Sequence, residues 1–270
     1  MLKPIQLLFD FLHGPALTEA THIQLGKDLN PSPVVAAVTP PRNGPIAYEV
    51  KHSMRRRSLA LEVYRDARVV VRAPSACPDD VVSRYIRRHQ RWIARQLAHF
   101  ETLPQPRPAP QYRAGEAHLY LGREYRLVLC PDRSSKIAIA GDDLKVSGLA
   151  AADPSSTESA LARWYHTHAR VEFAKILATC HAHTRFAPHP LPALKVRTMR
   201  TRWGTMCTQR GMTLNTVLIQ SPRECIEYVV FHELCHLSYR GHGPRFYRLL
   251  SSVLPDWEAR KRRLESTITW

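Results

Sequence analysis

Two histidines and a glutamate near the carboxyl end of the chain have the spacing of a catalytic metal site. Residues 225–239 read CIEYVVFHELCHLSY, in which His232 and His236 are four residues apart and Glu233 directly follows the first histidine. On a helix, both imidazoles project from one face and can bind one metal ion. Glu233 reaches the same side, where it can take a proton from water bound to that ion. The H-E-x-x-H pattern therefore indicates hydrolysis at a metal centre.

A third histidine lies where it can complete the ligand set. Gly241 and Pro244 predict that the helix ends near residues 240–241, and His242 follows that turn, six residues after His236. Three histidines with an open fourth position are typical of a catalytic zinc site rather than a structural one. The alternative is that these histidines are merely packed or solvent-facing.

The helix that carries the motif has a well-marked start and an apolar surface. Ser221, Pro222 and Glu224 form a capping-box pattern with proline at the first helical position, which predicts where the helix begins. The helix is apolar on nearly every side except at the motif, which predicts burial. Ionisable groups buried in such a helix need a partner such as a metal ion. A β-pair over residues 194–206 and 212–219, turning at residues 209–211, precedes it.

The rest of the chain predicts an α+β protein in three parts. Residues 1–48 contain seven of the 21 prolines and balanced charge, which predicts a weakly ordered extension with one short helix near residues 5–12. Residues 49–150 predict a β-rich unit with one basic amphipathic helix, and residues 151–270 a second unit that starts with a long helix to about residue 183. No internal repeat is visible in the sequence. The short strands expected in the middle part are residues 59–63, 69–71, 118–121, 125–129, 137–140 and 144–146.

Charge and composition limit the class of protein. The chain has 39 Lys and Arg against 23 Asp and Glu, a net charge of +16, so its surface attracts polyanions such as nucleic acid. The basic helix begins after Pro78 and carries a second face that could bind phosphates, formed by Arg84, Arg87, Arg88, Arg91 and Arg95. No segment has the length and apolar character of a membrane span, and no signal peptide is recognisable, so we expect a soluble, cytoplasmic protein. The six scattered cysteines predict free thiols.

These motifs resemble those of one known family. The segments RTRWGTMCTQRGMTLNTVLIQ, HELCHLSYRGHGPRFYRLL and LPDWEARKRRL, with RRRSLALEVYRDARVVVRAP and HQRWIARQL upstream, are similar to the YgjP-like metallopeptidases, which are related to SprT-like zinc metallopeptidases. The resemblance covers about residue 48 to the carboxyl end. It implies a zincin-like carboxyl-terminal unit with a short antiparallel sheet, His232, His236 and His242 as metal ligands, and Glu233 as the catalytic glutamate.

The resemblance also implies roles on the β-pair, with some departures. Arg202, Trp203 and Asn215 match family positions. One interpretation is that these residues are structural. The other is that they belong to an edge strand to which an extended substrate adds as a further strand, with Arg202 binding an acidic group. The family often has Ser-Cys where this chain has Thr205 and Met206, so a cysteine role is not transferred. Two other departures are Gly241 in place of asparagine and Tyr247 in place of tryptophan, and neither is a presumed ligand.

The sequence therefore favours a zinc metallopeptidase with one Zn²⁺ per chain, although imidazoles also suit other divalent transition metals. Its substrate is a peptide or protein, and water bound to the metal and activated by Glu233 attacks the peptide carbonyl. Arg202, Asn215 and Tyr239 are candidates for substrate binding or oxyanion stabilisation. Two alternatives remain, a metal-dependent phosphohydrolase acting on nucleotides and a basic nucleic-acid-associated protein with a structural metal site. The oligomeric state is left open.

Overall fold

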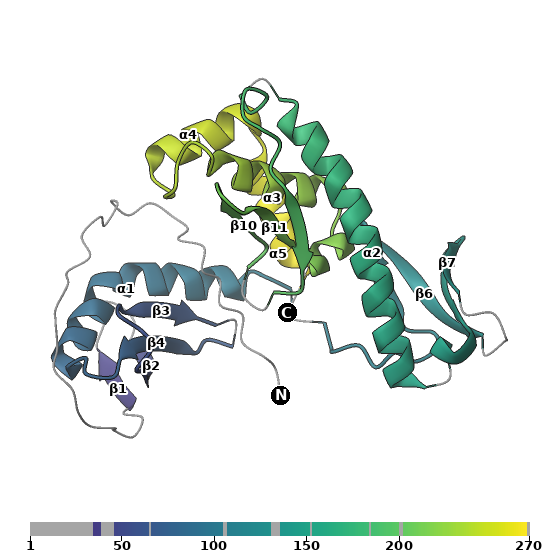
Figure 1. The fold of residues 1–270 in the computed structure, drawn as a ribbon. Coiled ribbons are helices and arrows are strands. Elements are labelled where there is room, and N and C mark those ends of the chain that lie inside the picture. Colours follow the sequence, from purple (N-terminus) through teal and green to yellow (C-terminus); the bar gives the residue numbers. More distant parts are fainter. Residues whose placement is uncertain are drawn as a thin grey trace. The chain divides into compact units, whose positions relative to one another are not determined.

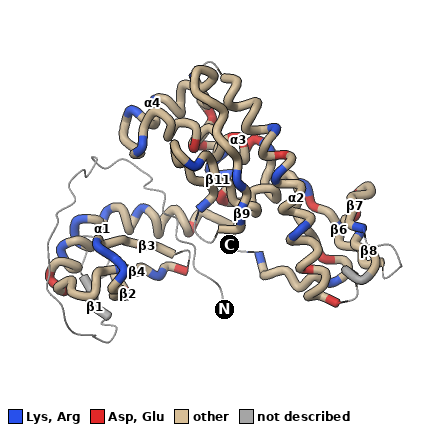
Figure 2. The backbone as a smooth tube through the Cα atoms, in the orientation of Figure 1, with Lys and Arg blue, Asp and Glu red and all other residues tan. Residues whose placement is uncertain are grey.

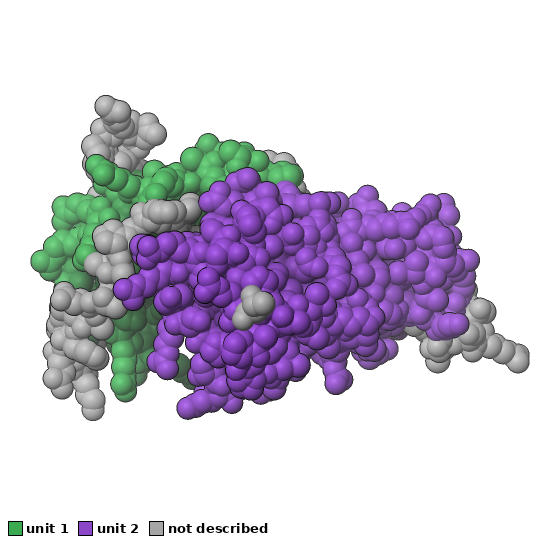
Figure 3. Space-filling view, turned by 90° about the horizontal axis from the view of Figure 1, so that it is seen from above, with its two compact units in different colours: residues 1–104 green, residues 105–270 purple. Residues whose placement is uncertain are grey.

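The computed structural model of the chain describes residues 35–38, 46–64, 66–104, 107–130, 136–151, 153–183, 185–199 and 202–268. The chain forms two compact units, residues 1–104 and 105–270, which Figure 3 colours separately. The expected helix near residues 5–12 lies outside the described residues. The mixed α+β class predicted from the sequence is confirmed at this level, with five α-helices and three small sheets in the described part.

The first unit is a four-stranded sheet with one helix. Its strands are β1 (Val35–Val38), β2 (Ile46–Ser53), β3 (Ala60–Val63) and β4 (Val69–Pro74), in the order β1-β2-β4-β3. The expected hairpin at residues 59–71 is present as the antiparallel pair β3 and β4, and β2 runs parallel to β4. Helix α1 (Asp79–Glu101) starts after Pro78, as the sequence predicted. The sheet and helix are shown in Figure 1.

The second unit begins with a sheet of the same topology. Its strands are β5 (Ala117–Tyr120), β6 (Arg123–Cys130), β7 (Ile137–Ala140) and β8 (Asp143–Ser147), in the order β5-β6-β8-β7 with β6 parallel to β8. Both sheets thus join two hairpins through a central parallel pair, and each is followed by a long helix. The topology repeats although the sequence shows no repeat. The strands expected within one part of the sequence fall into two sheets, one in each compact unit.

Helix α2 connects the β5–β8 sheet to the layer that carries the motif. The helix (Pro154–His181) follows the short 3₁₀ helix η1 (Gly148–Ala151), and the Asp153 carboxylate caps it by accepting the N–H of Ser156. The buried Tyr165 hydroxyl donates to the carbonyl of Leu119 on β5 at 2.9 Å. Further along, buried apolar residues such as Phe173 and Leu177 lie on a helix that contacts α3 (Arg223–Cys235). One helix therefore packs against both parts of this unit.

A three-stranded sheet lies beside α3. It consists of β9 (Leu194–Arg197), β10 (Gly204–Cys207) and β11 (Gly211–Asn215), in the order β10-β11-β9. The sequence predicted one long strand over residues 194–206, and this was wrong, because the chain leaves the sheet after Arg197 and returns at Gly204 on the other side of β11. The turn at residues 209–211 is as expected. Residues Thr216–Gln220 form the 3₁₀ helix η2 rather than strand.

Two short helices complete the second unit. They are α4 (Pro244–Val253) and α5 (Trp257–Thr267), and both contact α3. Figure 1 shows the two helices in yellow, with α3 between them and α2. None of the described helices has the length and apolar character that a membrane crossing requires.

Candidate metal centre

The motif helix begins and ends differently from the prediction. No side chain caps α3, because Pro222 occupies the N-cap and the Ser221 hydroxyl instead donates to the carbonyl of Leu218. The α-helix ends at Cys235 with His236 as its C-cap, about five residues before the expected end. His236 keeps a right-handed helical backbone, with φ −69° and ψ −12°, so it still lies one turn after His232. The motif spacing survives although the helix is shorter.

Three histidine side chains converge at this end of α3. Each of His232, His236 and His242 offers one ring nitrogen, and these three atoms lie within 4.8 Å of one another. The Nε2 atoms of His232 and His242 are 3.0 Å apart. Three imidazole nitrogens facing one point form a donor set that can hold a metal ion. His242 reaches this point from the loop before α4, as its position after the glycine turn predicted.

The environment of the histidines keeps the imidazoles neutral. Burial lowers the pKa of His232 well below its usual value, and the neighbouring His242 and His236 lower it further. Burial also lowers the pKa of His242 to about 4, with a contribution from His236. Burial lowers the pKa of His236, although the hydrogen bond to the Tyr239 carbonyl opposes this. Neutral imidazoles are the form that binds metals.

The ring orientation of His236 is fixed by a backbone group. Its Nδ1–H donates to the carbonyl of Tyr239 at 2.8 Å, which leaves Nε2 as the nitrogen available to a ligand. Such a hydrogen bond on the second ring nitrogen is typical of metal-binding histidines. Tyr239, expected as a substrate contact through its side chain, therefore joins the site through its backbone.

Glu233 is buried against strand β10. It is 2% exposed, and burial raises the pKa of its carboxyl to about 8, while the positive charge of Arg202 and the N–H of Met206 oppose this rise. A Cβ atom on Gly204 would lie 2.7 Å from Oε1 and 2.9 Å from Cγ of Glu233. Any other residue at this position would force the Glu233 side chain or β10 to shift, a close approach that the sequence analysis missed. The sequence signal for this close approach was the glycine directly after Arg202 and Trp203.

Phe246 supports all three histidines and was also missed. It is fully buried on α4, and its ring centroid lies 4.9 Å from that of His232, 4.8 Å from that of His236 and 4.7 Å from that of His242. One aromatic side chain therefore packs against every imidazole of the cluster. Its place two residues after Pro244, in the first turn of the helix that follows His242, was the signal that could have found it.

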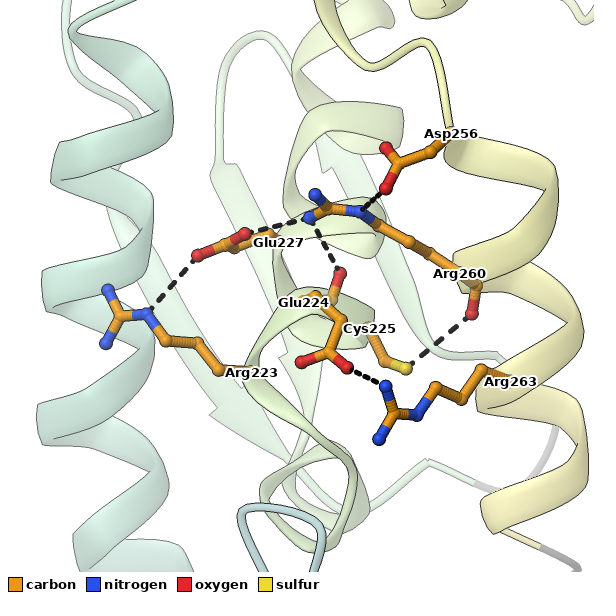
Figure 4. Close-up of polar contacts among 7 residues, drawn as sticks. All are labelled: Arg223, Glu224, Cys225, Glu227, Asp256, Arg260 and Arg263. Carbon is orange, nitrogen blue, oxygen red and sulfur yellow. Dashed lines mark hydrogen bonds and ion pairs between the residues drawn. The ribbon is translucent and has the colours of Figure 1, made fainter.

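Ion pairs hold α5 against the opposite end of α3. Arg260 donates to Glu227 at 2.9 Å and to Asp256 at 2.9 Å, and it also reaches the carbonyl of Glu224. Arg263 pairs with the carboxylate of Glu224. Figure 4 shows these side chains bridging the two helices, with Arg223 on the side of Glu227 away from Arg260 and the Cys225 thiol directed at the carbonyl of Arg260. The network holds the amino-terminal end of α3, which follows η2 in the sequence, against α5.

Asn215 and Arg202 lie on the sheet side of the site. The fully buried Asn215 amide accepts the N–H groups of Met199 and Val217 and donates to the carbonyls of Met199 and Arg202. It thereby closes the segment that leads from β9 back to β10. The Arg202 side chain is exposed, yet its charge acts on Glu233. The structure thus brings the histidines, Glu233 and Arg202 together, with Asn215 supporting the segment behind them.

Of the three comparisons with known proteins, the family profile agrees with the motifs. No curated protein matches the chain. Among solved structures, the crystal structure of the metallopeptidase zymogen of Methanocaldococcus jannaschii jannalysin matches 36% of this chain and 90% of that chain, with 17% identity and a TM-score of 0.27. The profile of the YgjP-like metallopeptidase domain matches residues 57–267, which is nearly all of the second compact unit and a little less than half of the first. The chain is therefore an enzyme of the metal-dependent peptidase class and belongs to the YgjP-like metallopeptidase family.

Proposed function

We propose that this protein is a zinc-dependent peptidase that uses His232, His236 and His242 as metal ligands and Glu233 as general base. The convergence of three imidazole nitrogens within 4.8 Å is the observation that carries the proposal. Imidazole nitrogens suit zinc, and a set of three leaves a coordination position open for water or substrate. Zinc held there would polarise a peptide carbonyl and lower the pKa of water from 15.7 to about 7.

Glu233 is the group that moves the proton. It follows the first histidine ligand and is buried between α3 and β10, where bulk water does not compete for its carboxylate. A carboxyl whose pKa lies near neutral can accept a proton from water and return it to the leaving amine. The Met206 N–H and the charge of Arg202 oppose the rise in its pKa, and a metal ion held by the adjacent histidines would favour the ionised carboxylate further, the form that acts as a base.

Strand β10 offers a place for an extended peptide. It is an edge strand of its sheet in the described part of the chain, and it lies directly beside Glu233. A peptide that pairs with an edge strand gains backbone hydrogen bonds without regard to its side chains. We propose that Arg202 binds an acidic group of this peptide, that Asn215 positions the Arg202 segment, and that Tyr239 is a further contact.

Metal analysis combined with a hydrolysis assay tests the proposal. Mass spectrometry is expected to find one zinc per wild-type chain and a loss of zinc in His236→Ala, whereas His181→Ala, which changes a histidine on α2, keeps it. Glu233→Gln is expected to keep zinc and to lose peptide hydrolysis by about 10²- to 10⁴-fold, since general acid–base groups contribute that much. Glu258→Gln, at an exposed carboxylate on α5, serves as its control.

Three results would contradict the proposal. Full peptidase activity in Glu233→Gln would remove the assigned base. Turnover of nucleoside triphosphates instead of peptides in the same screen would make the protein a phosphohydrolase. Zinc that is needed for folding, with no turnover of either substrate class, would make the site structural.

A further inference from the structure

Helix α1 presents one face made of arginine side chains. Arg84, Arg87, Arg88, Arg91 and Arg95 recur at helical spacing and are all exposed. At 3.6 residues per turn they fall within an arc of roughly 100° and extend about 16 Å along the helix axis. Figure 2 shows the corresponding blue segments recurring along α1. All five cations of this face are arginines, and α1 contains no lysine.

The opposite face of α1 is fully used within the first unit. Val82, Ile86 and Ile93 are at most 1% exposed and belong to one core cluster with strands β2, β3 and β4. Partly buried side chains on the flanks of the helix, such as Trp92 and Leu97, pack against the same cluster. The main apolar face of the helix is therefore packed against the sheet and is not free to enter a lipid bilayer, as an amphipathic membrane helix requires.

The arginine face has few acidic partners of its own. The helix has no acidic residue between Asp80 and Glu101. Arg84 pairs with Asp80, whereas no described acidic side chain pairs with Arg87, Arg88, Arg91 or Arg95. Like charges gathered on one helix oppose folding by repulsion, and an external anion relieves that repulsion.

A second basic segment lies at the end of the sheet where α1 begins. Strand β2 runs parallel to β4, so residues 54–57 leave the sheet at the same end as Pro74, from which the chain enters α1. This segment reads Met-Arg-Arg-Arg, with Met54 91% exposed and Arg55 and Arg57 also exposed. The positive charge thus continues from the helix face to the adjoining end of the unit.

We propose that this arginine face binds the phosphodiester backbone of a nucleic acid. One guanidinium group can donate hydrogen bonds to two oxygens of a phosphate. The phosphates of a duplex recur at regular intervals, so several arginines in a row on one helix can bind successive phosphates. A membrane is disfavoured because the main apolar face of α1 is buried against the sheet. The proposal is independent of the peptidase chemistry, because it concerns the other compact unit.

Fluorescence anisotropy on the full, metal-loaded chain tests the proposal. The probes are labelled duplexes of 20 base pairs, one of DNA and one of RNA, titrated at several salt concentrations. The test variant is Arg87→Gln/Arg88→Gln/Arg91→Gln/Arg95→Gln. The matched control removes the same charge from exposed arginines of the second unit, as Arg113→Gln/Arg163→Gln/Arg170→Gln/Arg185→Gln. Thermal denaturation verifies that both variants fold.

The expected result is specific to the helix. The wild-type chain binds at least one duplex, the test variant binds it about tenfold or more weakly with a salt slope reduced by about three, and the control changes affinity less than threefold. Equal weakening by both variants would mean that only net charge matters, which would overturn the proposal. The absence of binding to either duplex at low salt would also overturn the proposal, as would equal competition for the duplex by polyglutamate. The same holds if the test variant loses binding to anionic vesicles but keeps its binding to the duplexes.

Discussion

Two helices of this protein carry polar side chains at helical spacing, and they use them in opposite environments. On α3 the motif residues His232 and Glu233 are at most 2% exposed, and their neighbours come from β10, the α4 loop and α4. On α1 the arginines are exposed, and Arg84 and Arg95 contact Asp80 and Arg91 of the same helix. A buried polar group must find partners wherever the fold places them, whereas a solvated charge needs only its position on the helix. We therefore expect substitutions of neighbouring residues, which leave the motif residues and the arginines unchanged, to damage the α3 site but not the α1 face.

Among substitutions that leave the ligands and Glu233 unchanged, the largest effect on turnover is expected at Gly204. In Gly204→Ala the new Cβ would meet the Glu233 carboxylate at 2.7 Å, so either the carboxylate or β10 must move. A displacement of about 1 Å in a catalytic group can reduce turnover by about 10²-fold. We expect kcat to fall by that order while zinc binding is kept, as measured by peptide hydrolysis and metal analysis.

Gly241→Ala is the control for this comparison. A Cβ atom at Gly241 has no neighbour within 4 Å, although the residue is next to His242. Its kcat should stay within about twofold of the wild type, since surface substitutions without contacts have small effects. Equal losses in the two variants would show that the site does not depend on the close approach at Gly204.

The next effect is expected at Phe246. Phe246→Ala removes a buried ring that packs on all three imidazoles, so we expect a loss of about 3 to 5 kcal/mol in the free energy of unfolding and weaker zinc binding by the folded protein. Urea denaturation and zinc titration measure the two quantities. Phe173→Ala, at a fully buried ring on α2, should lose similar stability but bind zinc with nearly wild-type affinity. If both variants weakened zinc binding equally, Phe246 would act only as core.

A smaller effect is expected at Arg260. Its side chain is 21% exposed and bonds to Glu227, Asp256 and a backbone carbonyl, so Arg260→Gln leaves partly buried acceptors without a donor. We expect a loss of about 1 to 3 kcal/mol in unfolding free energy by urea denaturation. Arg262→Gln, at an exposed arginine 4.0 Å from Glu258, should change it by less than about 0.5 kcal/mol. Similar losses in the two variants would contradict the role of the network.

The smallest effect is expected on the arginine face itself. Arg84→Gln breaks an exposed ion pair with Asp80, in which both side chains are about two thirds exposed. The unfolding free energy should change by less than about 0.5 kcal/mol, because exposed pairs at this spacing contribute little. A loss above about 1 kcal/mol in thermal or urea denaturation would mean that the face serves the fold, which would break the comparison with α3.

The sequence by itself determined those features that depend on neighbours along the chain. The start of α1 after Pro78, the hairpin of β3 and β4, and the turn at Gly211 follow from local propensities and were predicted. The pattern H-E-x-x-H with a later histidine was enough to propose a ligand set, because four-residue spacing places two side chains on one helical face. The row of arginines on α1 likewise follows from residue spacing along the chain alone.

Tertiary structure decided what depends on neighbours far apart in the sequence. The placement of Arg197 and Gly204 on opposite sides of β11, the burial of Glu233 against Gly204, and the packing of Phe246 on three imidazoles all join separate segments. Helix α3 ends at Cys235, six residues before Gly241, and the chain beyond it brings His242 back to His232. The common topology of the β1–β4 and β5–β8 sheets is invisible in the sequence because strand order depends on pairing, while any apolar residues of suitable pattern can form the strands.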